Sequence, residues 1–271
     1  MSLPVLRRLA APIVGRVQLQ PLFEFMQRVS LRGMNYGGTG DIPDTGELAV
    51  LRYVRERLRQ HDSRLVVCDV GANVGDWAAA AVSCLAPRVT VFAFEPSPVT
   101  FQSLLARAGS LHGTRCLNFG LSDVNGTSSL YVVDGQSGLA SLYARDLRHV
   151  GLASHFEAEV PVRTLDAFAS ENGLTRIHLL KLDVEGHELK VLRGAQSLLA
   201  GGAIDFIQFE FGGCNIDSRT FLRDFFRMLA PAYTISRVVR GGLYPLGTYR
   251  ETHEVFVTAN YLAELKREYS S

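Results

Sequence analysis

Short apolar runs recur along the chain, and segments with helical periodicity separate them. The runs cover residues 65–69, 89–95, 115–121, 177–183 and 204–211. Three of them end in a carboxylate, at Asp69, Glu95 and Asp183. Apolar runs of this length alternating with helices are typical of buried parallel strands. The pattern predicts an α/β fold with a mostly parallel sheet, in which ligands bind at the carboxyl edge of the strands.

The first run opens into a glycine loop, residues 71–75, before the helix-forming alanines of residues 78–81. A dinucleotide-binding fingerprint that starts at Gly71 needs two further glycines, where this chain has Asn73 and Asp76. Since Asp76 begins the helix and Asp69 ends the strand, the loop is unsuited to a polyphosphate. It suits a cationic or zwitterionic ligand that carries a ribose. The alternative interpretation is a tight turn without a ligand.

Glu95 ends the second run and is followed by Pro96. An acidic residue about twenty positions after a glycine loop is where nucleotide-binding α/β proteins recognise ribose hydroxyls. Its carboxylate can accept two hydrogen bonds from a cis-diol. The alternative is a solvated strand end.

The third run leads into Ser122 and Asp123, and then into the turn Asn125-Gly126. The alternating segment 127–133 that follows predicts a hairpin or a strand return. Asp123 is either a partner for an adenine amino group or a turn residue that binds its own backbone.

The fourth run opens into Asp183, Glu185 and His187 at the start of a helix that is predicted to end at Gly201-Gly202. Ionisable groups this close together shift one another's pKa values, which is useful for removing a proton from a hydroxyl. Glu188 is interpreted instead as a carboxylate that favours the helix N-terminus. Near the end of the fifth run, Glu210 is expected to face the same crevice as Asp183.

Several segments together resemble the FkbM family of S-adenosylmethionine-dependent methyltransferases. They are CDVGANVGDW, FEPSP, NFGLSD, VPVRTLDAF and LLKLDVEGHELKVLRGA, and the resemblance runs from about Gly46 to Asn260. The glycine loop alone is shared by many methyltransferases, whereas its combination with KLDVEGHE is specific. The resemblance implies a class I methyltransferase, Rossmann-like fold: seven strands, six parallel and the last inserted antiparallel. It also implies O-methylation of a sugar, polysaccharide or polyketide-like acceptor.

The resemblance also implies roles for the residues. Asp69, Gly71, Asn73 and Gly75 would line the methionine and ribose of the cofactor, and Glu95 would hold the ribose diol. Asp123, with Leu121 or Ser122, would bracket the adenine. The DVEG segment falls on Asp183–Gly186, and we expect Asp183, Glu185, His187 and Glu210 at the point of methyl transfer.

Two other functions stay open at this point. A nicotinamide-dependent oxidoreductase is disfavoured by Asn73 and Asp76. A catalytically silent domain that binds adenosylmethionine is disfavoured because binding alone would not require the acidic cluster. The same cluster could hold a divalent cation that acidifies the acceptor hydroxyl. We expect metal-free catalysis, with the Asp183 and Glu185 pair ahead of His187.

Composition narrows the class of protein. With 271 residues and 47% hydrophobic residues, the chain is long enough for one large domain and an extension. The formal net charge is +1, so the chain lacks the excess of basic residues that is typical of nucleic-acid-binding proteins. The four cysteines lack paired C-x-x-C spacing, so we expect reduced thiols and a cytoplasmic protein. The expected partner is a small-molecule or glycan acceptor.

The two ends of the chain carry weaker signals. Residues 1–45 are expected to form a helical extension or lid, and residues 46–271 the methyltransferase domain. Arg7-Arg8 and the apolar segment after them resemble a signal peptide, but Pro12 and Arg16 interrupt it. A helix over residues 19–31 is predicted to pack on the domain or cover the pocket rather than bind a membrane. A second helix is predicted from the Asp44 and Glu47 spacing, and the last two strands at residues 233–239 and 253–258.

Overall fold

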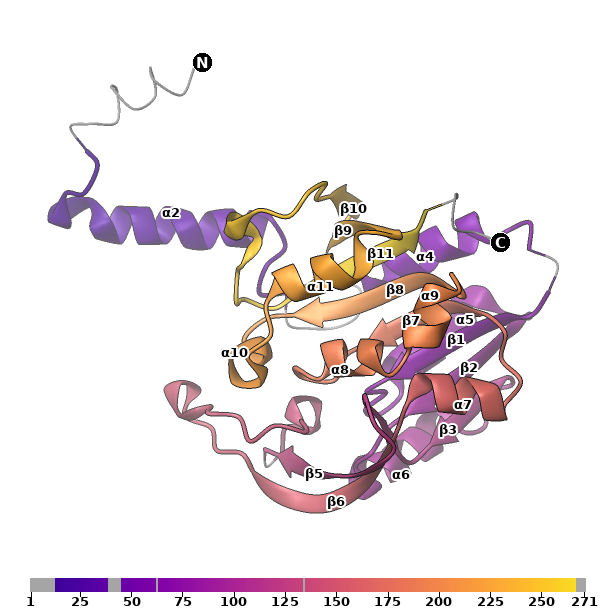
Figure 1. Cartoon of the computed structure of the whole chain (residues 1–271). Coiled ribbons are helices and arrows are strands. Elements are labelled where there is room, and N and C mark those ends of the chain that lie inside the picture. The colour runs from indigo at the N-terminus through magenta and orange to yellow at the C-terminus, as the bar shows by residue number, and fades with distance from the viewer. Residues whose placement is uncertain (1–12, 39–44, 62, 134, 267–271) are drawn as a thin grey trace.

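A computed structural model describes residues 13–38, 45–61, 63–133 and 135–266 (Figure 1). Its centre is an eight-stranded sheet with the order β10-β9-β11-β8-β7-β1-β2-β3. The strands are β1 (Leu65–Val70), β2 (Val89–Phe94), β3 (Thr114–Leu117), β7 (Ile177–Leu182), β8 (Ile204–Phe211), β9 (Tyr233–Val239), β10 (Gly242–Pro245) and β11 (Ala259–Leu265).

The directions of the strands confirm the predicted fold class. Strands β3, β2, β1, β7 and β8 are parallel to one another, and β11 lies antiparallel between β8 and β9. This is the class I methyltransferase sheet with its inserted last strand. The additional edge strand β10 forms an antiparallel pair with β9.

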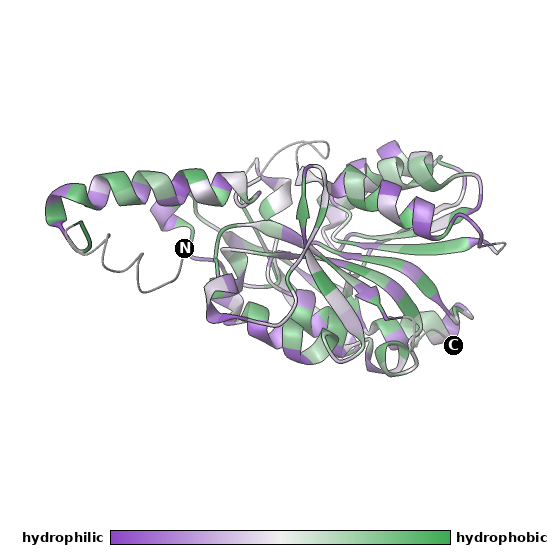
Figure 2. Cartoon of the chain, turned by 90° about the horizontal axis from the view of Figure 1, so that it is seen from above, coloured by the Kyte–Doolittle hydropathy of each residue, from purple (hydrophilic) through white to green (hydrophobic). Residues whose placement is uncertain are grey.

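Helices cover both faces of this sheet and divide the core in two (Figures 1 and 2). One face packs against α4 (Glu47–Arg57), α5 (Asp76–Leu85) and α6 (Pro98–Ala108). The other packs against α7 (Leu165–Glu171), α8 (Glu188–Arg193), α9 (Gln196–Ala200) and α11 (Leu222–Leu229). The aromatic stripe of α11 is buried as core: Phe225 is fully buried and stacks on Phe209 with ring centroids 4.6 Å apart.

A second, three-stranded sheet lies beside the carboxyl ends of the main strands. It consists of β4 (Gly120–Leu121), β5 (Gly126–Val132) and β6 (His155–Arg163) in the order β4-β6-β5. Strand β5 pairs antiparallel with β6. It covers most of the segment 127–133, for which the sequence predicted a hairpin or a strand return. The connection between β5 and β6 contains the short helices η2 (Ser137–Leu139) and η3 (Arg148–Val150).

The N-terminal extension contains η1 (Val17–Leu19) and α2 (Gln20–Gly33), so a helix forms where one was predicted. No residue of α2 is buried, and Figure 1 shows this helix extending away from the sheet. The second predicted helix is α4, which begins at Glu47; Asp44 lies outside the described residues. Within the described part of the chain, no helix combines the length and hydrophobicity needed to span a membrane.

Two predictions of secondary structure were wrong. The last strand is β11 at Ala259–Leu265, whereas residues 251–253 form the short helix η4 (Glu251–His253). The sequence ANYLAEL has helix-forming composition, but insertion between β8 and β9 buries Tyr261 and Ala263 completely and outweighs that propensity. The helix predicted after Glu188 breaks at Gly194 into α8 and α9. A Cβ at Gly194 would lie 2.0 Å from the Ser122 carbonyl oxygen.

Candidate functional site

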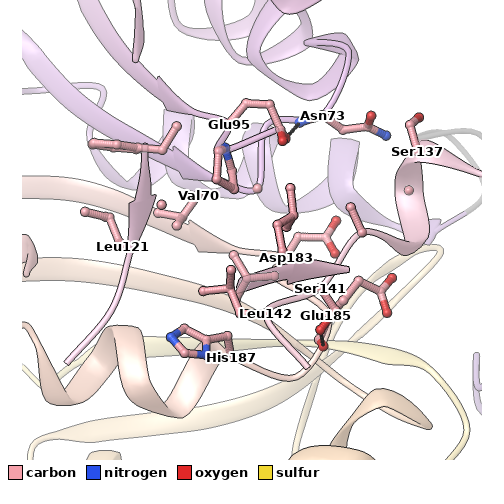
Figure 3. Close-up of a pocket in the computed structure, with 18 residues that line it drawn as sticks. Val70, Asn73, Glu95, Leu121, Ser137, Ser141, Leu142, Asp183, Glu185 and His187 are labelled. Carbon is pink, nitrogen blue, oxygen red and sulfur yellow. Dashed lines mark hydrogen bonds between the residues drawn. The ribbon is translucent and has the colours of Figure 1, made fainter. Parts of the chain in front are cut away.

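A cavity opens where the carboxyl ends of β1, β2 and β7 meet the second sheet (Figure 3). The empty space at this site, open solvent included, is about 640 Å³. Six of the predicted site residues line it: Gly71, Asn73, Glu95, Asp183, Glu185 and His187. The remaining walls include Val70, Phe94, Leu121, Leu130, Ser137, Ser141 and Leu142.

The glycine loop is held against two neighbouring strands. The backbone N–H groups of Gly71 and Ala72 both donate to the carbonyl oxygen of Phe94, at 3.0 and 2.9 Å. Gly71 has a φ of +82°, and a Cβ there would lie 1.8 Å from the backbone oxygen of Asp183. Only glycine fits at this position, because the loop after β1 and the end of β7 touch backbone to backbone.

Glu95 is fixed at the cavity by its own hydrogen bonds. One carboxylate oxygen accepts from the N–H of Asn73 and the other from the N–H of Ser97, both at 2.9 Å. Asn73 adopts the left-handed conformation, with a φ of +47°, which directs its N–H to Glu95. Burial raises the pKa of Glu95 to about 7, although the two backbone hydrogen bonds act against this rise. Each carboxylate oxygen keeps a second lone pair for a hydroxyl in the cavity.

Gly75 does not line the cavity. It has a φ of +92°, and a Cβ there would lie 2.8 Å from Leu104 Cδ1 and 3.2 Å from Ala108 Cβ. This glycine therefore allows α5 to begin directly against α6. Gly75 therefore has a packing role in this structure, and its contact with a cofactor stays a prediction.

Asp69 also lies behind the wall of the cavity. Its carboxylate is completely buried, and its counterion is Lys181, whose Nζ lies 3.6 Å from Oδ1. Lys181 also lies 3.0 Å from Asp183 Oδ2 and 4.0 Å from Glu47 Oε1. The ring of Trp77 covers the ammonium at 5.5 Å. This cluster was not predicted from the sequence. The signal for it was Lys181, a charged residue in a mostly apolar run, two positions before Asp183.

Asp183 and Glu185 reach the cavity from the loop after β7 (Figure 3). The Glu185 carboxylate forms an ion pair with Arg145, whose side chain is 9% exposed and whose Nε lies 3.7 Å from Asp217 Oδ2. Burial raises the pKa of Glu185 to about 8; the charge of Asp183 adds to this rise and Arg145 opposes it. Glu185 itself has a φ of +51°, and its carbonyl oxygen accepts from Ser141 Oγ at 2.8 Å.

Glu210, on β8, lies next to Glu185 but does not line the cavity. One potential ligand atom from each of Glu185, Glu210 and Cys214 lies within 4.8 Å of the others. Burial and the surrounding carboxylates raise the pKa of Glu210 well above its usual value. Arg145 already supplies a positive charge to Glu185 in this cluster.

His187 lies apart from the two carboxylates, on the side of Leu121 (Figure 3). Its Nε2 is 2.9 Å from Ser122 Oγ, and this hydroxyl donates to Asp123 Oδ1 at 3.0 Å. Burial lowers the pKa of His187 to about 4, so the ring is neutral near pH 7. His187 is therefore connected by hydrogen bonds to Ser122 and Asp123, which do not line the cavity. The sequence had placed it with Asp183 and Glu185.

Glu188 lies at the N-terminus of α8, where the sequence placed it as a structural carboxylate. Its carboxylate is completely buried and accepts from the backbone N–H groups of Val184 and Gly186, both at 3.1 Å. These bonds hold the loop that carries Asp183 and Glu185.

Comparison with known proteins assigns the family. Residues 69–230, more than half of the chain, match the model of the methyltransferase FkbM domain. The chain therefore belongs to the FkbM methyltransferase family.

Three similar proteins are named as methyltransferases. The hexuronic acid methyltransferase AglP of Haloferax volcanii is 30% identical over 61% of this chain and 62% of its own length. The 2-O-methyltransferase NoeI of Sinorhizobium fredii is 28% identical over 57% of this chain and 66% of its own. The 31-O-demethyl-FK506 methyltransferase FkbM of Streptomyces tacrolimicus is 32% identical over 48% and 59%. The chain thus spans less than two thirds of the length of each.

Among solved structures, the methyltransferase FkbM from Methylobacillus flagellatus aligns with a TM-score of 0.43 and 17% identity. The alignment covers 74% of this chain and 44% of that one.

Proposed function

We propose that the protein is an S-adenosylmethionine-dependent O-methyltransferase that acts on a hydroxyl of a sugar, polysaccharide or polyketide-like acceptor. The observation that carries the proposal is Glu95, fixed by two backbone hydrogen bonds at the wall of a cavity that Asp183 and Glu185 also line. The names of NoeI and FkbM each give an oxygen position, which supports O-methylation, and the name of AglP gives a hexuronic acid, which supports a sugar-like acceptor.

The residues of the cavity fit this cofactor. The side-chain oxygen of Asn73 and Nδ1 of His187 are buried and, within the described part of the chain, have no hydrogen-bond partner. They can bind polar groups of an amino acid head or an adenine. The loop lacks the second and third glycines of a pyrophosphate site, which favours this cofactor over a dinucleotide.

When bound, the cofactor would supply a methyl group on a sulfonium, whose sulfur would leave as a neutral thioether. The acceptor oxygen would gain this methyl group and lose its proton. We assign this proton to the Asp183 and Glu185 pair, because both carboxylates line the cavity while His187 is a weak base with a pKa of about 4. All four cysteines are free, and we extend the proposal to a reducing, cytoplasmic compartment.

Calorimetric titration tests the cofactor assignment. The protein is expected to bind adenosylhomocysteine and not NAD. Glu95→Ala should weaken this binding by about 1.5–3 kcal/mol, the scale for hydrogen bonds to a charged group. Glu159→Ala, an exposed change on β6, serves as the control and should leave the affinity unchanged. Equal affinity in the Glu95 variant would reject the assignment.

A panel of acceptors then separates an enzyme from a silent binding domain. Uronic acids, neutral sugars and macrolide alcohols are offered with adenosylmethionine, and release of adenosylhomocysteine is measured. Turnover with any hydroxyl acceptor supports the proposal. Cofactor binding without turnover on any of them would favour the silent domain.

A further inference from the structure

Helix α2 carries an apolar stripe that the described residues leave uncovered. Leu22, Phe25, Met26 and Val29 follow the spacing of one helical face. Their side chains are 52%, 56%, 43% and 54% exposed, and no residue of α2 is buried. Large apolar side chains gathered in this way usually mark an interaction surface.

Among the described residues, the hydrogen bonds that join this segment to the body lie just after the C-terminal end of α2. Gly37 donates its N–H to the carbonyl oxygen of Thr258 at 2.7 Å, and the buried hydroxyl of Tyr36 accepts from Arg237 at 3.0 Å. From this attachment α2 extends clear of the body in both views (Figures 1 and 2). Its exposed face is therefore accessible to an extended surface.

The net charge of residues 13–33 indicates which kind of partner surface α2 would bind. Residues 13–33 contain Arg16, Arg28 and Arg32 against the single carboxylate of Glu24, a net charge of +2 in a chain whose total is +1. Arg28 and Arg32 lie along one flank of the apolar stripe on the helical wheel. Two copies of α2 in contact would bring like charges together, whereas anionic headgroups would complement them.

We propose that α2 docks the protein on a membrane surface rich in anionic phospholipids. The helix lies in the plane of the interface, with Leu22, Phe25, Met26 and Val29 at the acyl boundary. Arg28 reaches the headgroup phosphates, and Arg32, whose guanidinium donates to the Gly37 carbonyl oxygen at 2.7 Å, adds positive charge beside them. A helix with a basic flank and Phe and Leu on its apolar face is suited to this position. With 14 residues α2 is too short to cross the bilayer, so the attachment is peripheral.

Vesicle flotation of the full chain tests this proposal. The protein is expected to float with phosphatidylcholine vesicles that contain phosphatidylglycerol, and much less with phosphatidylcholine alone or at high salt. Phe25→Ser should weaken binding about tenfold, since the ring leaves the acyl boundary. Arg28→Gln should weaken it about fivefold, the effect of one basic residue near an anionic surface.

Matched controls use exposed residues elsewhere. Val99→Ser, at the start of α6, and Arg59→Gln, beyond the end of α4, should bind vesicles like the unchanged protein. Absence of flotation, or equal flotation of Phe25→Ser, overturns the proposal. So does a dimer in sedimentation velocity that Phe25→Ser dissociates, because the stripe then binds a second copy. A lower melting temperature of Phe25→Ser also overturns it, since the stripe would then pack on the body.

Discussion

Asp69 and Lys181 stand directly opposite each other on the neighbouring strands β1 and β7, and both side chains are buried. Their positions put both on the face of the sheet that α4 and α5 cover. Lys181 therefore balances Asp69, Asp183 and Glu47 at once, within 4.0 Å of each. This lysine connects the start of α4, the end of β1 and the loop after β7 beneath the cavity.

Removing the charge of Lys181 should strongly destabilise the protein. Lys181→Met leaves buried carboxylates without a counterion, and we expect a loss of about 3–5 kcal/mol in the free energy of unfolding, measured with urea. The double variant Lys181→Met with Asp69→Asn should lose less than the sum of the single changes. Arg59→Met, which breaks an exposed pair with Glu56, should cost at most about 1 kcal/mol. A similar small cost for Lys181→Met would contradict this account.

Binding of adenosylhomocysteine should depend on pH through Glu95. Only the ionised carboxylate accepts hydrogen bonds from both ribose hydroxyls, so affinity should fall as the pH drops below about 7. Titrations across this range should show a flat profile for Glu95→Gln. A pH profile unchanged by that substitution would show that Glu95 is not the titrating group.

The raised pKa of Glu95 should change the stability of the free protein in the opposite direction: cofactor affinity rises with pH, whereas the free energy of unfolding falls. The folded pKa of Glu95, about 7, exceeds its usual value of 4.5. Because the folded protein binds this proton more tightly than the unfolded chain, protonated Glu95 contributes to the free energy of unfolding. This contribution is fully present below pH 4.5 and is lost as the pH rises through 7. Urea unfolding of the protein and of Glu95→Gln at several pH values measures this difference.

Gly71 should tolerate no side chain. Gly71→Ala places a Cβ against the Asp183 carbonyl oxygen and should separate the glycine loop from β7. We expect loss of cofactor binding and a clear drop in melting temperature. Gly151→Ala is the matched control, because its φ of +74° imposes the same backbone strain but nothing lies within 4 Å of the new Cβ. It should cost about 1–2 kcal/mol. Equal effects of the two changes would leave no role for the contact with Asp183.

The strand pattern and the family resemblance were sufficient to predict the fold class and six of the residues that line the cavity. Asp69, Glu95 and Asp183 were placed at one edge because parallel strands end together. Sequence spacing does not tell which of two successive side chains faces a cavity, and so Asp69 was assigned to a surface that its buried carboxylate does not reach. It also does not show that a glycine is needed for helix packing, as Gly75 is against α6. Arg145 could not be predicted as the partner of Glu185, since it comes from the long connection between β5 and β6.

The Asp183 and Glu185 pair should control proton removal, and His187 should not. Asp183→Asn and Glu185→Gln are each expected to lower kcat by about 10²–10⁴-fold, the usual contribution of a general base. Because the pKa of Glu185 is about 8 and the base must be ionised, kcat should rise as the pH increases through 8. His187→Gln should preserve that profile. Asp217→Asn, which changes the other partner of Arg145, tests whether Glu185 acts only through its ion pair.

Chelation completes the test of this catalytic pair. Arg145 occupies the position of a counterion to Glu185, so EDTA should leave turnover unchanged. Activity that EDTA abolishes and magnesium restores would assign Glu185, Glu210 and Cys214 to a metal instead. Near-normal kcat in both Asp183→Asn and Glu185→Gln would remove the pair from the mechanism. A loss in Asp217→Asn equal to that in Glu185→Gln would show that the ion pair with Arg145, and not proton removal, is what the reaction requires.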